Sequence, residues 1–234
     1  MPKPRIAILG DGGWGTTLAV LLSKKGYSVR LWGNFAGYTN KMVKTRLNPK
    51  FLPGIKIPRQ ISITNDIKSA AEDKEIIVLA VPSQYTRQIL RKIVGSFAKK
   101  TIFLSVTKGI EIGSSKRMSE VIRAELGPVK LAVLSGPTIA SEVAKEVPTA
   151  AVAASADKQI RKIIQTVFST KRFRVYTNPD LVGVELGGSL KNVIAIACGV
   201  ADGLGFGANT KAAILTRGLA EISRLGKAMG AKLE

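Results

Sequence analysis

Few residue types in this 234-residue chain could perform acid–base chemistry, because it contains no histidine and a single cysteine, Cys198. Without histidine, Ser-His-Asp and Cys-His arrangements are excluded. Zinc sites built from His and Cys are also excluded, and we expect no metal site. One cysteine cannot form an intramolecular disulfide. A general acid or base must therefore be Lys, Tyr, Asp or Glu.

Lys191 is the main candidate for that role. In the segment E-L-G-G-S-L-K-N-V-I-A, which covers residues 185–195, a helix would place Gly187, Gly188 and Ala195 on the face of Lys191. Two glycines inside a helix cost about 1 kcal/mol each relative to alanine. The two glycines make sense if another group must lie against the helix backbone at this point. The alternative is a surface lysine with a buried stem and a solvated ammonium group.

A glycine-rich loop with the pattern G-x-G-x-x-G is the second candidate site. It follows a short apolar run and opens a helical pattern, which is the context in which this motif binds a dinucleotide. The first glycine allows the tight turn, the second lets the pyrophosphate approach the backbone, and the third lets helix and strand pack closely. Free N–H groups at the helix start then face the phosphates. The loop residues are Gly10, Asp11, Gly12, Gly13, Trp14 and Gly15.

The residue that recognises the cofactor ribose should follow the second strand, about 20 residues after the loop, and it is acidic in NAD-specific sites. The segment 29–34 contains no acid, and Asn34 stands at its end. Asn34 would not repel a 2′-phosphate, and Lys41, Lys44 and Arg46 follow. The sequence therefore favours NADP over NAD, or the use of both. The alternative is that Asn34 merely starts a turn.

Unusual residues also follow other apolar runs, where a parallel sheet binds its ligands. Lys108 directly follows such a run and is well placed to hold a phosphate or a carbonyl; the alternative is a solvated loop lysine. Gly136 permits a close backbone approach, and Thr138 offers a hydroxyl at a helix start. The four positions are the Gly10 loop, Val81-Pro82-Ser83, Thr107-Lys108-Gly109 and Ser135-Gly136-Pro137-Thr138.

Strand and helix patterns alternate along most of the chain. The expected strands are Arg5–Leu9, Val29–Trp32, Ile61–Thr64, Ile76–Val81, Thr101–Val106, Leu131–Leu134, Thr149–Ala154 and Phe173–Tyr176. The expected helices are Trp14–Lys25, a short one capped by Asp66, one from Ser83 to about Phe97, Ser114–Leu126, one beginning near Thr138, and Asp157–Phe168. Phe35–Pro58 shows no regular pattern. This alternation predicts an α/β fold with a doubly wound, Rossmann-type, largely parallel sheet.

The pattern changes after Pro179, where Asp180 can cap a long helical stretch that no strand follows. We therefore expect a dinucleotide-binding domain over residues 1–180 and an incomplete helical substrate domain over residues 181–234.

The formal charge of +20, from 36 Lys and Arg against 16 Asp and Glu, could indicate a nucleic-acid partner. The basic residues are spread along the chain without interleaved aromatic residues, so we expect small anionic ligands and no nucleic acid. No stretch approaches the roughly 20 apolar residues that a membrane span needs. The first residues do not form a signal peptide. The sequence thus predicts a cytoplasmic protein.

Taken together, these segments resemble the bacterial NAD(P)-dependent glycerol-3-phosphate dehydrogenases. Ser-Gly-Pro-Thr and Leu-Gly-Gly-Ser-Leu-Lys-Asn are the most specific motifs. Related lysine-using dehydrogenases of the 6-phosphogluconate and 3-hydroxy-acid type share the Lys-Asn pair but not Val-Thr-Lys-Gly-Ile-Glu. The matching stretches, in family order, are Ile8–Thr17, Phe51–Gly54, Leu79–Ser83, Val106–Glu111, Leu134–Val143, Glu185–Ala197 and Asp202–Glu221.

The resemblance implies hydride transfer between NAD(P)H and dihydroxyacetone phosphate, giving sn-glycerol 3-phosphate for membrane lipid synthesis. It implies that the cofactor is contacted by Gly13, Trp14, Asn34, Lys108 and Ala140. It implies that the substrate is contacted by Lys108, Gly136, Thr138 and Lys191, with Lys191 as proton donor and acceptor.

The chain departs from the family pattern at three places. Gly13 stands where Ser or Ala is usual, and Asn34 where a charged or imidazole side chain is usual. The family continues with Gly-Asp-Leu and Ser-Arg-Asn segments beyond the last residue here. Two hypotheses follow. The first is an enzyme of this family, either shortened or completed by a second polypeptide that supplies the C-terminal part; a homo-oligomer is the other partner that the sequence leaves open. The second is a truncated nucleotide-binding remnant or sensor that binds NAD(P) without turnover.

Overall fold

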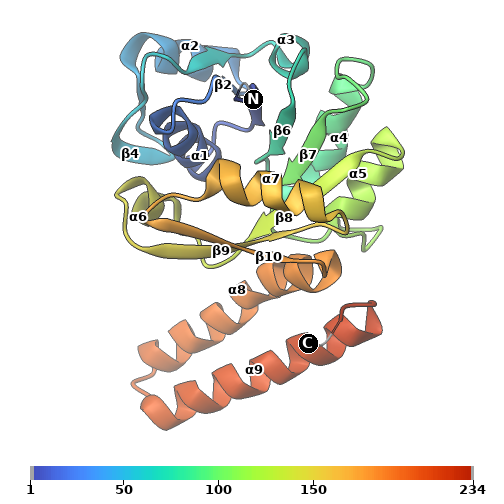
Figure 1. The fold of residues 1–234 in the computed structure, drawn as a ribbon. Helices are drawn as coiled ribbons and strands as arrows, with labels where there is room; N and C mark the ends of the chain where they lie inside the picture. The colour runs from blue at the N-terminus through green and yellow to red at the C-terminus, as the bar shows by residue number, and fades with distance from the viewer. Residues whose placement is uncertain (1–2, 233–234) are drawn as a thin grey trace.

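The computed structural model describes residues 3–232 as a large sheet with helices on both faces, followed by two long helices (Figure 1). The strands of the large sheet are β1 (Ile6–Leu9), β2 (Val29–Trp32), β5 (Ser62–Thr64), β6 (Ile76–Leu79), β7 (Ile102–Ser105), β8 (Lys130–Ser135), β9 (Thr149–Ala154) and β10 (Phe173–Asn178). A second, two-stranded sheet joins β3 (Leu47–Asn48) and β4 (Leu52–Lys56). The helices are α1 (Gly13–Lys24), α2 (Ala36–Thr45), α3 (Ile67–Ala71), α4 (Ser83–Ile93), α5 (Met118–Leu126), α6 (Ala140–Ala144), α7 (Lys158–Phe168), α8 (Leu181–Gly203) and α9 (Ala208–Ala228).

The strand order in the large sheet is β10-β9-β8-β7-β6-β1-β2-β5. The strands from β8 to β5 are parallel, β9 is antiparallel to β8, and β10 is parallel to β9. The predicted doubly wound, largely parallel sheet is therefore confirmed. Since β1, β6, β7 and β8 are parallel neighbours, their carboxyl ends lie at one edge, where such sheets bind ligands.

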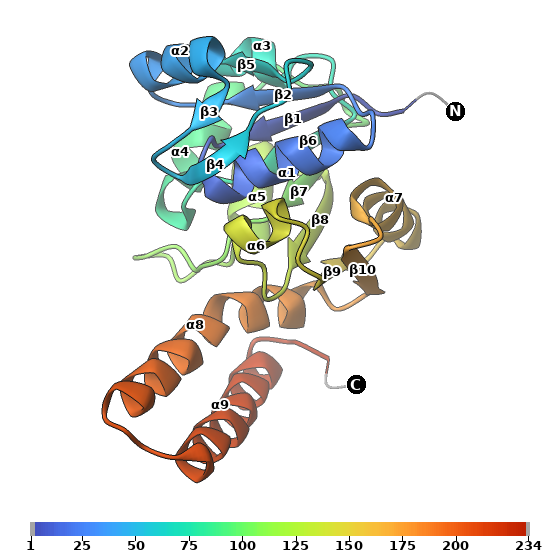
Figure 2. The same ribbon diagram turned by 90° about the vertical axis from the view of Figure 1, so that its left-hand side faces the viewer.

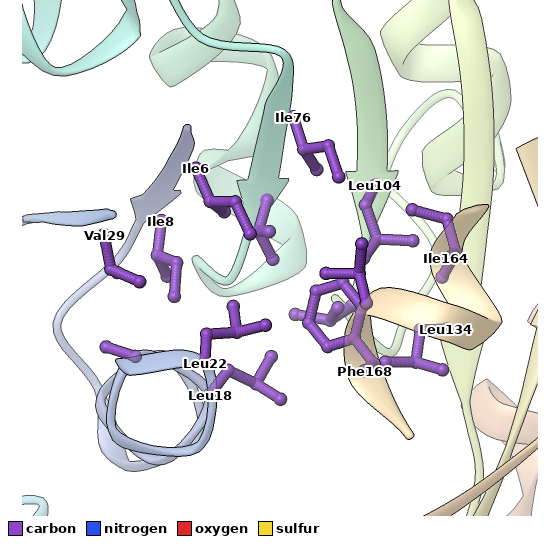
Figure 3. Close-up of a cluster of buried hydrophobic side chains, with 14 of the residues drawn as sticks. Ile6, Ile8, Leu18, Leu22, Val29, Ile76, Leu104, Leu134, Ile164 and Phe168 are labelled. Carbon is purple, nitrogen blue, oxygen red and sulfur yellow. The ribbon is translucent and has the colours of Figure 1, made fainter. Parts of the chain in front are cut away.

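Both faces of the sheet are buried. Successive residues of β1 alternate between two apolar clusters, with Ile6 and Ile8 in one and Ala7 and Leu9 in the other. The first cluster lies under α1 and α7 (Figure 3), and the second includes residues of α3, α4 and α5. Burial of one large aliphatic or aromatic side chain contributes about 1.5–3 kcal/mol. Side chains of the first cluster include Leu18, Leu22, Val29, Ile76, Leu104, Leu134, Ile164 and Phe168.

The prediction of an irregular segment over Phe35–Pro58 is wrong, because this segment contains α2, β3 and β4. Only Thr39 and Met42 of α2 are buried, so the helix has almost no apolar stripe. Pro53 and Gly54 lie inside β4, and both residue types normally argue against a strand.

Some predicted helix ends also differ. Pro82 rather than Ser83 occupies the N-cap of α4, which ends at Ile93 instead of near Phe97. α5 begins at Met118, later than predicted, because a tight turn precedes it. The helix expected near Thr138 begins two residues later, with α6. The predicted caps are found at Asp66 and Asp180, and Asp157, predicted as the first residue of a helix, is the N-cap of α7.

α8 and α9 pack against each other as an extended pair beside the sheet domain (Figure 2). The Asp180 carboxylate accepts hydrogen bonds from the backbone N–H groups of Gly183 and Lys232, each at 3.0 Å, so the end of the described chain returns to the start of α8. The expectation of no membrane-length segment needs one correction. By length and composition alone, α8 could cross a membrane, although the core helix of a soluble protein meets the same criteria.

Candidate cofactor and substrate site

The glycine loop connects β1 to α1, and three of its glycines are required by packing. Gly10 has a φ of +125°, and a Cβ there would lie 2.5 Å from the Ala80 carbonyl oxygen. A Cβ on Gly15 would lie 1.9 Å from the Gly10 oxygen, which explains the close contact of helix and strand. A Cβ on Gly13 would lie 2.5 Å from the Phe51 oxygen, so the residue that the family usually carries there would need a shifted loop.

Gly12 differs from the other loop glycines. Its φ of −65° and ψ of 177° suit any residue, and a Cβ built on it meets no atom within 4 Å. No packing in the described structure therefore requires glycine at this position. The open space in front of the α1 N-terminus fits the close approach of a pyrophosphate to the backbone.

The hairpin β3–β4 holds the glycine loop in place. The buried Asn48 amide donates hydrogen bonds to the Asp11 carbonyl oxygen at 2.7 Å and to Thr16 Oγ1 at 2.8 Å. Its oxygen accepts from the Tyr38 hydroxyl at 2.6 Å. Sequence reasoning missed this residue because nothing in its local pattern indicates a contact with a loop that lies more than thirty residues away.

Trp14 and Ala140 extend the loop region. The Trp14 ring packs on Phe173 with centroids 6.2 Å apart, and its buried Nε1 has no partner among residues 3–232. Ala140 begins α6, and its carbonyl oxygen accepts from Thr17 Oγ1 at 3.0 Å. The Ala140 methyl group lies 3.5 Å from the Cβ position of Gly13. The structure therefore brings Ala140 to the glycine loop, whereas the Trp14 indole faces the interior.

The carboxyl end of β2 is formed by Gly33 and the exposed Asn34. The Asp11 side chain lies against Gly33, and Oδ2 of Asp11 has no hydrogen-bond partner in the described part of the chain. Burial raises the pKa of Asp11. Arg46, one of the basic residues expected near a 2′-phosphate, donates instead to the Ile61 carbonyl oxygen at 2.8 Å.

The ends of β7 and β8 meet through their side chains. Lys108 Nζ donates to Thr138 Oγ1 at 2.9 Å. Burial, and secondarily the positive charge of Lys191, lower the pKa of Lys108 to about 8. Gly136 has a φ of +154°, and a Cβ on it would lie 2.9 Å from the Ala150 carbonyl oxygen, so the backbone requires glycine there.

Lys191 belongs to α8, which approaches Lys108 at Gly188, where a Cβ would lie 4.0 Å from Lys108 Cγ. Its Nζ donates to the Asn192 side-chain oxygen at 3.0 Å. The two glycines that precede it have different roles. A Cβ on Gly188 would lie 2.0 Å from Ser135 Oγ, so this glycine lets α8 approach β8, whereas Gly187 faces open space. The expectation that both glycines leave room for a ligand therefore stands only for Gly187.

Two side chains of α8 fix the helix to the sheet domain, and sequence reasoning did not find either. Glu185 is 6% exposed and accepts from the Ser119 backbone N–H at 2.8 Å and from Arg117 Nη1 at 2.6 Å. Burial raises the pKa of Glu185, while its partners on α5 act in the opposite direction. The Ser189 hydroxyl accepts from the Gly109 N–H at 2.9 Å. The helix that carries Lys191 is thus held against the Lys108 loop.

The arrangement has the parts of a dehydrogenase site. The open α1 N-terminus can hold a pyrophosphate, Lys108 offers a partly buried positive charge, and Lys191 is a nearby proton source. No cluster of three or more acidic or cysteine side chains that could hold a metal ion occurs among residues 3–232.

The sequence matches two family models that together span most of the chain. Residues 5–161 match the N-terminal part of NAD-dependent glycerol-3-phosphate dehydrogenase, and residues 180–234 match its C-terminal part. The membrane-length helix α8 lies within the second match.

Individual relatives and solved structures agree with the family models. A glycerol-3-phosphate dehydrogenase [NAD(P)+] from Prosthecochloris aestuarii is 51% identical over 228 residues, 96% of this chain and 69% of that protein. One from Geobacter sulfurreducens is 48% identical over 98% of this chain and 70% of that protein. The crystal structure of glycerol-3-phosphate dehydrogenase from Coxiella burnetii superposes with a TM-score of 0.93 at 41% identity, covering 98% of this chain and 70% of that one. The chain therefore belongs to the NAD(P)-dependent glycerol-3-phosphate dehydrogenase family.

Proposed function

We propose that this chain catalyses reversible hydride transfer between NAD(P)H and dihydroxyacetone phosphate, giving sn-glycerol 3-phosphate for glycerophospholipid synthesis in the cytoplasm. The observation that carries this proposal is the convergence of three features at one edge of the sheet. They are the open glycine loop, Lys108 bonded to Thr138, and Lys191 on the adjoining helix. The names of the relatives supply the substrate.

Residues 1–180 would bind the cofactor, and residues 181–234 would contribute to the substrate side. When bound, the cofactor would supply the hydride for the carbonyl carbon of the ketone. Electrons of the carbonyl double bond move to oxygen, and the Lys191 ammonium group donates the proton that makes the hydroxyl. In the reverse direction, neutral Lys191 takes that proton back.

Lys108 would hold negative charge rather than move a proton. Its side chain is partly buried and fixed by Thr138, so its charge acts in a medium of lower dielectric than water. We assign it to the substrate phosphate or the carbonyl oxygen and to the adjoining cofactor. Gly136 and Thr138 would line the substrate side, and Gly13, Trp14, Asn34 and Ala140 the cofactor side.

The test is a steady-state assay of the purified chain with NADH or NADPH and dihydroxyacetone phosphate. We expect Lys191→Ala to lower turnover by about 10²- to 10⁴-fold, the usual contribution of a positioned acid, with cofactor affinity unchanged. Lys108→Ala should chiefly weaken substrate binding. Lys227→Ala, which removes an exposed lysine in the last turn of α9, is the matched control and should keep full activity.

A Lys191→Ala rate within a few-fold of the wild-type rate would contradict the assignment of the acid. Cofactor binding by the wild-type chain without any turnover would favour the alternative, a nucleotide-binding remnant or sensor.

A further inference from the structure

The carboxyl end of β2 lacks the acidic side chain that recognises ribose in many dinucleotide-binding sheets. Gly33, which is buried, and Asn34, which is exposed, are the first two residues after β2. A Cβ built on Gly33 would lie only 2.2 Å from Asp11 Oδ2. The space that a side chain of residue 33 would fill is therefore taken by the carboxylate of Asp11, which reaches it from the glycine loop.

One oxygen of the Asp11 carboxylate is buried without a hydrogen-bond partner in the described structure. Asp11 is 9% exposed, and its Oδ2 atom has no hydrogen-bond partner among residues 3–232. Its backbone oxygen is held by Asn48 and Thr16, so the backbone position does not depend on the side chain. A buried polar group without a partner costs about 1–3 kcal/mol, and a charged group costs more. The Oδ2 atom has no accessible surface, so a carboxylate retained at that cost is a candidate for an electrostatic effect on a nearby ligand.

A second unpartnered oxygen lies beside the same position. Thr39 of α2 is 1% exposed, and its hydroxyl has no partner among the described residues. Thr39 Oγ1 lies 2.6 Å from the Cβ position of Gly33. Two oxygens from separate elements thus converge on the end of β2.

The basic residues that would favour a 2′-phosphate are less well placed. Arg46 Nη1 donates to the Ile61 carbonyl oxygen. Lys41 and Lys44 are exposed on α2, where salt and water screen their charges. The Asp11 carboxylate is buried beside the end of β2, so water and salt screen its charge less than theirs.

We propose that Asp11 determines the cofactor preference of this chain: its negative charge beside the end of β2 repels the 2′-phosphate of NADP(H) and so favours NAD(H). This inference rests on the proposed function and opposes the NADP preference expected from Asn34 and its basic neighbours. Asp11 supplies from the first loop the negative charge that other dinucleotide-binding sheets supply from the end of β2.

The test uses the 234-residue chain and fluorescence titrations with NADH and NADPH in parallel. We expect the wild type to bind NADH more tightly than NADPH. Asp11→Asn keeps the shape of the side chain but removes its charge. The Kd for NADPH divided by the Kd for NADH should therefore fall by about tenfold. Asp11→Ala should reduce the same ratio. Thermal unfolding of each variant shows whether it folds. The midpoint of the unfolding transition should not fall, because each substitution removes an unpaired buried carboxylate.

Asp66→Asn is the matched control. Asp66 follows β5, the neighbour of β2, and the substitution changes the net charge by the same amount. Its carboxylate already caps α3 by accepting from the Ser69 N–H at 3.1 Å, and Asn is an equally good cap. The ratio should stay at the wild-type value.

Three outcomes would overturn the proposal: tighter binding of NADPH by the wild type, a ratio unchanged by Asp11→Asn, or an equal change caused by Asp66→Asn. Each of these leaves cofactor binding, and hence the proposed function, intact. If neither cofactor binds to the wild-type chain, the proposed function and this proposal both fail.

Discussion

At the scale of single residues, a substitution at Gly12 can test cofactor binding without disturbing the fold. Its backbone angles suit any residue, and a Cβ on it meets open space, so Gly12→Val should fold normally. The added side chain would occupy the space that a pyrophosphate needs. We expect Gly12→Val to lose most of its NADH and NADPH affinity with little change in thermal stability, as measured by fluorescence titration and by thermal unfolding.

Gly15→Val is the informative comparison, because a Cβ at Gly15 would lie 1.9 Å from the Gly10 oxygen. This variant should be strongly destabilised. Full cofactor affinity in Gly12→Val would show that the phosphates do not approach the loop at this point.

At the scale of elements, the placement of α8 depends on an ion pair across the two parts of the chain. Glu185 accepts from two groups at the N-terminus of α5, where the helix dipole also favours an anion. Glu185→Ala would remove one of the two acidic partners of Arg117, whose side chain is only 11% exposed, and leave Glu120 as the other. It would also leave the buried Ser119 N–H without its acceptor. We expect a loss of about 1–3 kcal/mol in the free energy of unfolding, as measured by denaturant titration.

Glu221→Ala is the control, because its ion pairs on α9 are exposed and should contribute about 0–1 kcal/mol. If Glu185→Ala costs no more than Glu221→Ala, the ion pair does not fix α8. Since α8 also carries Lys191, Glu185→Ala should reduce turnover even where the protein remains folded.

At the scale of the whole molecule, the α8–α9 pair carries exposed apolar side chains that recur at helical spacing. In α8 they are Val193, Ile196 and Val200, followed by Leu204 just after the helix end, and in α9 they include Leu215 and Leu219. Exposed apolar surface of this kind favours association, and the same stripe on a second copy is a suitable partner. We expect residues 1–234, purified alone, to self-associate in light-scattering measurements. Salt should strengthen this association, because it screens the repulsion between copies that each carry +20.

Ile196→Glu should weaken that association, whereas Ile163→Glu on α7, an exposed apolar position of another face, should not. A wild-type chain that stays monomeric at every concentration and salt level would contradict the prediction.

The local pattern of the sequence was sufficient for the strands of the large sheet. The strands are buried on both faces, so they appear as apolar runs such as Ile76–Leu79, and carboxylate caps such as Asp157 mark helix starts. The same pattern failed over α2 and β3–β4, which bury few side chains and include Pro53 and Gly54. Here contacts with the glycine loop, rather than local periodicity, stabilise the structure.

For the candidate site, the sequence by itself determined which residue types are present. It contains no histidine, a G-x-G-x-x-G loop, and lysines at 108 and 191 beside small residues. The tertiary structure decided what each of them faces. Glu185 meets Ser119 across 66 positions of the chain, and Asn48 meets Asp11 across 37. Likewise, the Asp11 carboxylate fills the place beside Gly33 only because β1 and β2 are neighbours in the sheet. Such contacts depend on how distant elements pack, and local periodicity carries no information about them.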